Sequence, residues 1–530
     1  MLKRNLLLSL LSALLLSLPW FSHFSGLLLL IAWVPLLALE HSFEKRQSNG
    51  CWKYYATTFV LWNIITTHWI ANATLWGAVA AILGNALQMF LIFALFRWVK
   101  RRTNPSIGYA FFIALWMAWE YFYFNAEISW PWLVLGNGFA KDIRLVQWYE
   151  YTGVLGGSLW VLISNILIFR GITLITSDQA RTKKSVFNFV LITLIILVPC
   201  IFSLIRFCTY KEAGDTCRVV VLQPNIDPYQ KFRDMPEQEQ LGIMLRQAVQ
   251  QADSVTDFVI APETAISNIL ENNPLQSPLM MDILQFLVPY PQASLIIGTA
   301  SRQLYPDGER PTYTARKYGN LYYDIFNSAM HIRRFDDIKF YHKSKLVVGV
   351  EKLPYPRLLN FLGDWSIKLG GSSGSFVPQA ERDTFNSVSQ KCKIGVAICY
   401  ESEYGAFYTE YVQKGANVMA IITNDAWWGN TVGYKQHLWY ASLRAIETRR
   451  GIARSTNTGI SAIINQRGEI VHRTPWCEEA SIKSDIATND YLTFYVKNGD
   501  YLGRAAALVL CLLTLYTIYT LWRKRKKLSL

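Results

Sequence analysis

Charged residues are scarce in this chain of 530 residues: Asp, Glu, Lys and Arg make up 17% of it, and apolar residues make up 52%. The chain also lacks the CxxC and HExxH spacings of metal sites, and its seven histidines are scattered. We therefore expect no metal ion and no other cofactor. Internal repeats, which are typical of transporters, are not evident either. This absence disfavours a transporter that carries an accessory outer domain.

The apolar residues are unevenly distributed, which predicts three parts: a membrane domain over 1–209, a soluble α/β domain over 210–495, and a final anchor with a basic tail over 496–530. A helix that spans a bilayer needs about 20 apolar residues. Eight segments meet this need, about seven of them in the first part: 5–22, 25–40, 55–72, 77–96, 106–124, 152–169, 186–207 and 503–522. The first also resembles a secretory signal peptide, but we interpret it as a retained span.

The net charge of +14 raises the question of nucleic-acid binding, but the basic residues stand beside the apolar segments. Lys and Arg gather in short cytoplasmic loops of membrane proteins. With the N-terminus inside, eighteen of these residues fall in inside segments and only two, Lys141 and Arg144, in the short outside loops. We therefore expect no nucleic-acid partner, a bilayer around the spans, the 210–495 domain outside the cytoplasm and Arg523–Lys527 inside.

The 210–495 region alternates short β-branched runs with longer amphipathic ones, which favours a layered α/β fold. Buried strands are predicted at 219–222, 258–260, 295–297, 394–398 and 418–422. Helices are predicted at 236–253, 402–414 and 435–450, and antiparallel strands within 319–334 and 460–472.

Polar side chains follow several of these predicted strands. Glu263 follows one strand, Cys399 another and Asn424–Asp425 a third, while Lys343 stands in a loop after 338–341. Active sites of layered α/β folds form at the carboxyl ends of strands. Each of these residues, taken alone, also has an ordinary structural explanation. Cys399 would be a buried inert thiol, Glu263 a helix cap, and Asn424–Asp425 part of a turn. Their joint placement favours a catalytic site.

The segments Ala261-Pro-Glu-Thr-Ala265, Tyr341-His-Lys343 and Ile398-Cys-Tyr-Glu401 resemble the Glu–Lys–Cys signature of the nitrilase superfamily. Three further stretches and the spans around the domain are similar to the membrane-bound branch of that superfamily, the bacterial apolipoprotein N-acyltransferases: Thr423-Asn-Asp-Ala-Trp-Trp-Gly429 with Gln436-His437, Arg444-Ala-Ile-Glu447, and Arg454-Ser-Thr-Asn-Thr-Gly459.

The resemblance implies an αββα sandwich joined to a multi-span helical domain in the bacterial cytoplasmic (inner) membrane, with the sandwich on the periplasmic side. It also implies transfer of an acyl chain from a phospholipid, usually phosphatidylethanolamine, to the α-amino group of an S-diacylglyceryl-cysteine lipoprotein. A membrane-anchored amidase that uses water as acceptor is the alternative.

A two-step exchange through a thioester suits two bulky lipid substrates that use one site in turn. Cys399 is then the nucleophile, Glu263 the general acid and base, and Lys343 a fixed positive charge beside the oxyanion, with the N–H after Cys399 as a second donor. Assisting roles are expected for Glu351, Tyr400 and Glu401, and substrate binding for Phe232, Asn424, Asp425, Trp427 and Trp428.

The chain departs from the family pattern at a few positions, where Ala261 and Phe232 replace tryptophans and 346–351 reads Leu-Val-Val-Gly-Val-Glu. Two questions stay open at this level. Cys217 and Cys392 both precede core strands, which makes a disulfide between them conceivable. The apolar segment 353–378, with a Gly/Ser-rich run, is either a mobile lid that touches lipid or a packed insertion.

Overall fold

The computed structural model describes residues 2–176, 182–227, 231, 235–305, 311–352, 355 and 376–528. Phe232 and nearly all of the segment 353–378 lie outside the described residues. The chain divides into two compact units. One comprises Met1–Ala71, Leu75–Thr209 and Asn498–Leu530, and the other comprises Asn72–Thr74 and Tyr210–Lys497.

The first unit is built from helices whose sequences are mostly apolar. Their bounds are α1 Leu2–Ser17, α2 Leu29–Ala32, α3 Val34–Lys45, α4 Trp52–Thr67, α5 Ile70–Ala73, α6 Leu75–Arg102, α7 Pro105–Asn125, α8 Tyr149–Thr176, α9 Lys183–Thr209 and α18 Tyr501–Leu528. Many large apolar side chains of α9 and α18 are exposed, including Phe187, Val198, Leu508 and Ile518. Apolar surfaces of this extent are stable against lipid rather than water. The protein is a multi-pass membrane protein.

Seven helical segments among the described residues are long and apolar enough to cross a bilayer, six of them before the soluble region. The predicted span 55–72 is not one of the seven, because α4 has only 16 residues. At 1.5 Å per residue such a helix is about 24 Å long, while the hydrocarbon core is about 30 Å thick. Whether α4 crosses with the help of α5 therefore decides on which side the next loops lie.

The second unit contains two β-sheets. The larger has eight strands in the order β14-β1-β2-β4-β6-β5, with β3 paired to β4 and β7 paired to β6. Their bounds are β1 Thr216–Gln223, β2 Phe258–Ile260, β3 Ile266–Leu270, β4 Ser294–Tyr305, β5 Arg316–Tyr318, β6 Leu321–Ile332, β7 Lys339–His342 and β14 Ala480–Ala487.

The smaller sheet has six strands in the order β13-β12-β11-β10-β9-β8. Their bounds are β8 Thr384–Asn386, β9 Lys393–Ile398, β10 Val418–Thr423, β11 Ile452–Thr456, β12 Ala462–Ile464 and β13 Ile470–Arg473. Strands β9, β10 and β11 run parallel, and β10 and β11 are buried at every position. Continuous apolar runs such as Val418–Ile422 are typical of strands covered on both faces.

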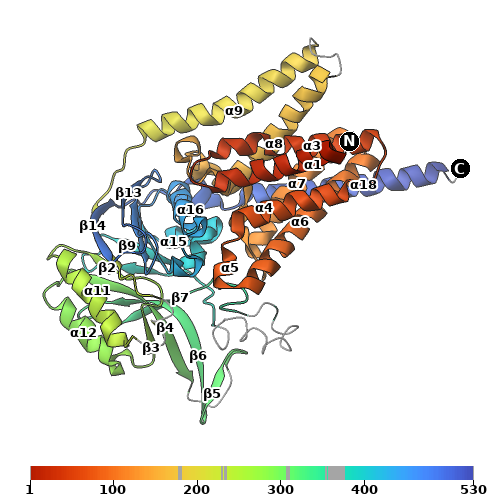
Figure 1. The fold of residues 1–530 in the computed structure, drawn as a ribbon. Coiled ribbons are helices and arrows are strands. Elements are labelled where there is room, and N and C mark those ends of the chain that lie inside the picture. Colours follow the sequence, from red (N-terminus) through yellow and green to blue (C-terminus); the bar gives the residue numbers. More distant parts are fainter. Residues whose placement is uncertain are drawn as a thin grey trace. The chain divides into compact units, whose positions relative to one another are not determined.

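The two sheets pack face to face, and helices cover their outer faces (Figure 1). Helices α11 Glu237–Gln251 and α12 Pro278–Leu287 lie on the larger sheet, while α15 Gly405–Gln413 and α16 Val432–Thr448 lie on the smaller one. Strands β1 and β11 meet between the sheets, where Ser455 Oγ donates a hydrogen bond of 2.7 Å to Leu222 O. The predicted fold class, a helical membrane domain plus an αββα nitrilase-like sandwich, is confirmed.

Cys217 in β1 of the larger sheet and Cys392 just before β9 of the smaller sheet are both buried and lie close together. Both are free thiols, and their sulfur atoms lie with a carboxylate oxygen of Asp257 within 4.8 Å of one another. Asp257 already accepts hydrogen bonds from Arg218 N and Ser389 Oγ. If the domain faces an oxidising compartment, this proximity favours a disulfide between Cys217 and Cys392.

We therefore predict a peptide linked through Cys217 and Cys392 in enzyme digested without reduction. Reduction is expected to lower the free energy of unfolding by about 2–5 kcal/mol. Denatured, unreduced enzyme in which maleimide labels both residues as fully as Cys399 would show the pairing to be wrong.

Candidate active site

Glu263 stands directly after β2, where the strand leaves the larger sheet. The chain turns closely over β4 here, and Gly298 N donates a hydrogen bond of 3.1 Å to Pro262 O. A Cβ atom on Gly298 would lie 2.5 Å from Glu263 Cα and from Pro262 O, so no other residue fits without displacing this turn. The adjacent Thr264 has φ +46°, a left-handed conformation that side chains rarely adopt.

Lys343 follows β7 and is fully buried between two carboxylates. Its Nζ donates hydrogen bonds of 2.8 Å to Glu263 Oε1 and of 2.8 Å to Glu351 Oε1. Asn327, from the neighbouring strand β6, donates from Nδ2 to the same two oxygens at 2.8 and 3.0 Å. Glu351 Oε2 in turn accepts from Val347 N at 2.7 Å. The lysine is thus fixed in position by groups from several parts of the sheet.

The electrostatics of Lys343 follow from this arrangement. Burial alone would lower its pKa, but the negative charges of Glu263 and Glu351, with a contribution from Cys399, hold the pKa well above its usual value. The ammonium group therefore stays charged at neutral pH. A fixed, buried positive charge is suited to stabilising a negative charge that develops beside it.

Cys399 directly follows strand β9 of the smaller sheet and begins the 3₁₀ helix η8 Cys399–Glu403. Its φ is +51°, so the nucleophile candidate stands on a left-handed turn, a conformation that must be held by its surroundings. Burial, and then the negative charge of Glu263, raise the pKa of its thiol well above the usual value, while Lys343 opposes this shift. The resting group is therefore a thiol and needs a base when it reacts.

The three signature side chains come from both sheets. Glu263 and Lys343 follow β2 and β7 of the larger sheet, and Cys399 follows β9 of the smaller one. Strands β6 and β9 are in contact across the sandwich, and the charges of Glu263, Lys343 and Cys399 influence one another. The predicted catalytic residues thus lie at one site at the sheet–sheet interface.

The two candidate assisting glutamates occupy different places. Glu351 contacts Lys343, whereas Glu401 is buried against backbone and tyrosine hydroxyl groups. Glu401 Oε1 accepts from Tyr341 Oη at 2.8 Å and from Ser344 N at 2.6 Å, and its Oε2 accepts from Ile398 N at 2.8 Å. It therefore connects the loop after Lys343 to the strand before Cys399. Tyr400 is buried and packs edge-on against Tyr404.

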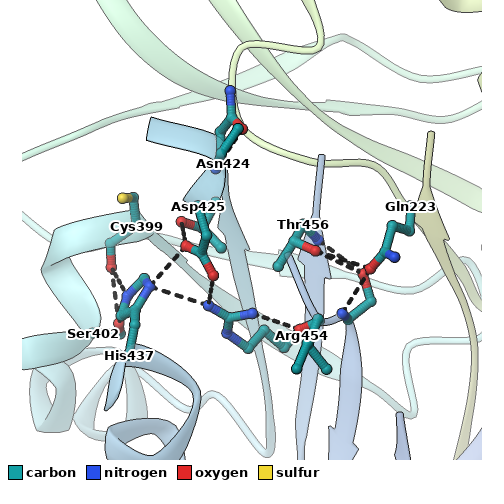
Figure 2. A network of polar contacts seen from close by, with 12 residues as sticks. Gln223, Cys399, Ser402, Asn424, Asp425, His437, Arg454 and Thr456 are labelled. Carbon is teal, nitrogen blue, oxygen red and sulfur yellow. Dashed lines mark hydrogen bonds and ion pairs between the residues drawn. The ribbon is translucent and has the colours of Figure 1, made fainter. Parts of the chain in front are cut away.

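Asp425 is fully buried within a polar network that reaches Cys399 through His437 (Figure 2). Its Oδ2 accepts from Arg454 Nη2 at 2.7 Å, and its Oδ1 lies 3.0 Å from His437 Nδ1. Burial would raise the pKa of Asp425, but Arg454 and His437 lower it to about 2, so the group is ionised. Asn424 caps the 3₁₀ helix η9 Asp425–Trp428 by accepting from Ala426 N at 3.4 Å.

Trp427 and Trp428 lie in η9 and are partly exposed. The ring of Trp428 packs edge-on against His437, with 5.4 Å between centroids. Lys231, the described neighbour of Phe232, is buried and donates to Thr264 O beside Glu263. Burial lowers the pKa of Lys231 to about 8, although Glu263 and Glu237 oppose the shift.

Sequence reasoning missed several supporting residues. Asn327 stands in an ordinary strand, and only the pairing of β6 with β4 and β7 brings its amide to Glu263. Gly298 carried a usable signal, since a glycine directly after the apolar run Leu295–Ile297, inside a strand, marks a close backbone approach. Ser402, three residues after Cys399, lacked any signal of its contact with the Cys399 carbonyl.

Comparison with known proteins agrees with this geometry. Residues 218–491 match the carbon-nitrogen hydrolase family, and residues 12–167 match the apolipoprotein N-acyltransferase N-terminal domain. The apolipoprotein N-acyltransferase of Chlorobaculum tepidum is 26% identical over 89% of this chain and 88% of its own length. The apolipoprotein N-acyltransferase of Geobacter metallireducens is 27% identical over 94% of this chain and 92% of its own length. Among solved structures, Saccharomyces cerevisiae Nit3 of the nitrilase superfamily is 16% identical, covers 52% of this chain and 92% of its own, and has a TM-score of 0.35.

The sandwich, with its Glu, Lys and Cys at one site, defines an enzyme of the carbon–nitrogen hydrolase class. The chain belongs, within this class, to the apolipoprotein N-acyltransferase family, and it is an acyltransferase.

Proposed function

We propose that this enzyme moves an acyl chain from a phospholipid to the N-terminal amine of a diacylglyceryl lipoprotein, through a thioester on Cys399. The observation that carries the proposal is the buried Glu263–Lys343 pair beside the Cys399 thiol. This arrangement supports the proposal, because a proton acceptor, a fixed positive charge and a nucleophile are the groups that thioester formation requires. The relatives named apolipoprotein N-acyltransferase supply the substrate class.

In the first half-reaction, Cys399 Sγ attacks the ester carbonyl carbon of the phospholipid while the Glu263 carboxylate takes the thiol proton. The carbonyl oxygen becomes an oxyanion beside the Lys343 ammonium. The carbon–oxygen bond of the ester then breaks, and Glu263 returns the proton to the departing lysophospholipid hydroxyl. The acyl group remains on Cys399 as a thioester.

In the second half-reaction, the α-amine of the lipoprotein attacks the thioester carbonyl. Glu263 takes a proton from the attacking nitrogen, and Lys343 again stabilises the oxyanion. The carbon–sulfur bond breaks, the proton passes to the Cys399 sulfur, and an amide is released. The partly exposed Trp427 and Trp428 are proposed to contact the acyl chain together with Phe232, and phosphatidylethanolamine is the proposed donor.

The test is to incubate the enzyme with phosphatidylethanolamine alone. A hydroxylamine-sensitive acyl group is expected on the Cys399 peptide, together with one lysophospholipid per acylated enzyme. If no acyl bond breaks until the lipoprotein is also present, the two-step proposal is wrong. Release of ammonia from simple amides, with no acyl transfer from phospholipid, would instead support the amidase alternative.

The same proposal places the sandwich on the periplasmic side of the bacterial inner membrane. The basic cluster Arg97–Arg102 at the end of α6 supports this orientation. If α4 did not cross, this cluster would lie outside, against the tendency of Lys and Arg to remain in the cytoplasm. We therefore propose that α4 and α5 together carry the chain across, which makes seven crossings before the sandwich and one after it.

This topology predicts that reporters fused near residue 71 and within the sandwich report the periplasm, while a reporter after Lys527 reports the cytoplasm. The sandwich and the tail on one side of the membrane would overturn the topology. A reporter at residue 71 on the cytoplasmic side would overturn the role of α4 and α5.

A further inference from the structure

Two side chains that the proposed chemistry does not use lie against the carbonyl group of Cys399. Ser402 Oγ donates a hydrogen bond of 2.8 Å to Cys399 O, and His437 Nε2 lies 3.4 Å from the same oxygen. Ser402 Oγ and His437 Nε2 are themselves 3.2 Å apart. Both residues are almost completely buried. Figure 2 shows them together below Cys399, on the side of its carbonyl.

The imidazole of His437 is oriented from its other nitrogen. Asp425 is ionised, because Arg454 and His437 hold its pKa at about 2, so its oxygens only accept hydrogen bonds. Thr423 Oγ1 also donates to Asp425 Oδ1, at 3.0 Å. His437 Nδ1 lies 3.0 Å from Asp425 Oδ1 and 3.1 Å from Arg454 Nη2, and these contacts orient the ring so that Nε2 faces Ser402 and the Cys399 carbonyl. Arg454 completes the chain of contacts by donating from Nη1 to Ile460 O at 2.6 Å.

Holding one end of a peptide group orients the other end. The peptide bond that follows Cys399 is trans, and the C=O and N–H of a trans peptide point in opposite directions. Fixing the Cys399 carbonyl toward Ser402 and His437 therefore fixes the Tyr400 N–H toward the other side. The left-handed φ of Cys399 makes this support necessary, because the backbone has no intrinsic preference for that conformation.

We propose that Ser402 and His437, braced by Asp425 and Arg454, are positioning residues for the oxyanion site. They aim the Tyr400 N–H so that it supplements Lys343 when the carbonyl oxygen of the bound acyl group becomes negative. This inference rests on the proposed thioester chemistry. Its consequence is that both half-reactions depend on this buried network, and that Asp425, expected from the sequence to bind substrate, acts by orienting His437 instead.

The test compares two reactions of Cys399, only one of which forms an oxyanion. A long-chain aldehyde forms a tetrahedral hemithioacetal with the thiol, whereas iodoacetamide alkylates the sulfur without a tetrahedral intermediate. For Ser402→Ala and His437→Asn, we expect acylation by phospholipid and affinity for the aldehyde to fall at least about 10-fold. The rate of Cys399 alkylation, followed on the Cys399 peptide by mass spectrometry, is expected to stay within about 3-fold of wild type.

Thr456→Val is the matched control. Thr456 is equally buried in β11 near Arg454, but its hydroxyl donates to Gln223 Oε1 at 3.1 Å instead of supporting Cys399. This variant is expected to keep wild-type acylation and aldehyde affinity. Ser402→Thr, which retains a hydroxyl, is expected to recover most of the activity lost in Ser402→Ala.

Three outcomes would overturn the proposal. One is near wild-type acylation in both Ser402→Ala and His437→Asn. Another is an equal loss of acylation, aldehyde affinity and alkylation, since that marks a displaced thiol or a loosened fold. The third is an equal loss in Thr456→Val. Absence of any acyl-enzyme in the wild type would contradict the proposed function instead, and the aldehyde comparison would still report on the oxyanion site.

Discussion

Replacing Cys399 by alanine is expected to abolish acyl-enzyme formation and acyl transfer together, with both falling below detection. In the proposed mechanism, the same sulfur atom forms the new bond in the first half-reaction and releases the acyl group in the second. Other buried polar groups lie near, but Ser402 Oγ is committed to the Cys399 carbonyl and does not offer a substitute nucleophile. The measurement is transfer of a radiolabelled acyl chain from phospholipid, first to the enzyme and then to a lipoprotein acceptor.

Cys477→Ala serves as the control, because Cys477 is an exposed free thiol in the same unit. It is expected to transfer acyl chains at the wild-type rate. If Cys399→Ala still transferred acyl groups when both substrates were present, the acyl chain would be passing directly between them. A thioester found on a different cysteine would show that Cys399 is not the nucleophile. If that cysteine were Cys477, Cys477→Ala would lose the acyl-enzyme.

Glu263→Gln is expected to slow each half-reaction by about 100- to 10,000-fold, the range over which a positioned acid or base contributes. The pKa of the Cys399 thiol is raised by burial and by Glu263 itself, so little thiolate exists at neutral pH without a base to take the proton. Glutamine keeps the shape of the side chain and an oxygen to accept from Lys343 and Asn327. The loss therefore reports on proton transfer more than on packing.

The two half-reactions are measured separately, by single-turnover acylation and by transfer from preformed acyl-enzyme to the acceptor. Glu271→Gln is the control for a partly buried carboxyl group directly after β3, since Glu271 accepts from Ser301 and lies 3.5 Å from His342 rather than at Lys343. It is expected to keep most of the activity. A Glu263→Gln enzyme that is slow in acylation but normal in transfer would show that a different group moves the second proton.

Much of the fold was predictable from local sequence. The strands β1, β2, β9 and β10 and the helices α11, α15 and α16 coincide closely with the predicted elements, while β4, predicted over 295–297, continues to Tyr305. Strands buried on both faces have continuous apolar runs, and helices buried on one face have apolar residues at a helical period, so both leave a local signal. The positions of Glu263, Lys343 and Cys399 at strand ends were equally visible, since each directly follows or closely trails an apolar run. Residues that are adjacent in sequence to a strong local signal are the ones that sequence alone locates.

Only the tertiary structure decided which groups meet across the strands. It brings Asn327 and Glu351 to Lys343, it places Glu401 against the backbone around Ser344 and Ile398, and it gathers Asp425, His437 and Arg454 beneath Cys399. The physical reason is that these contacts depend on sheet order, strand register and the packing of two sheets, none of which is encoded in the spacing of neighbouring residues. Sequence therefore located the proposed reacting groups, and long-range packing determined what holds each of them in place.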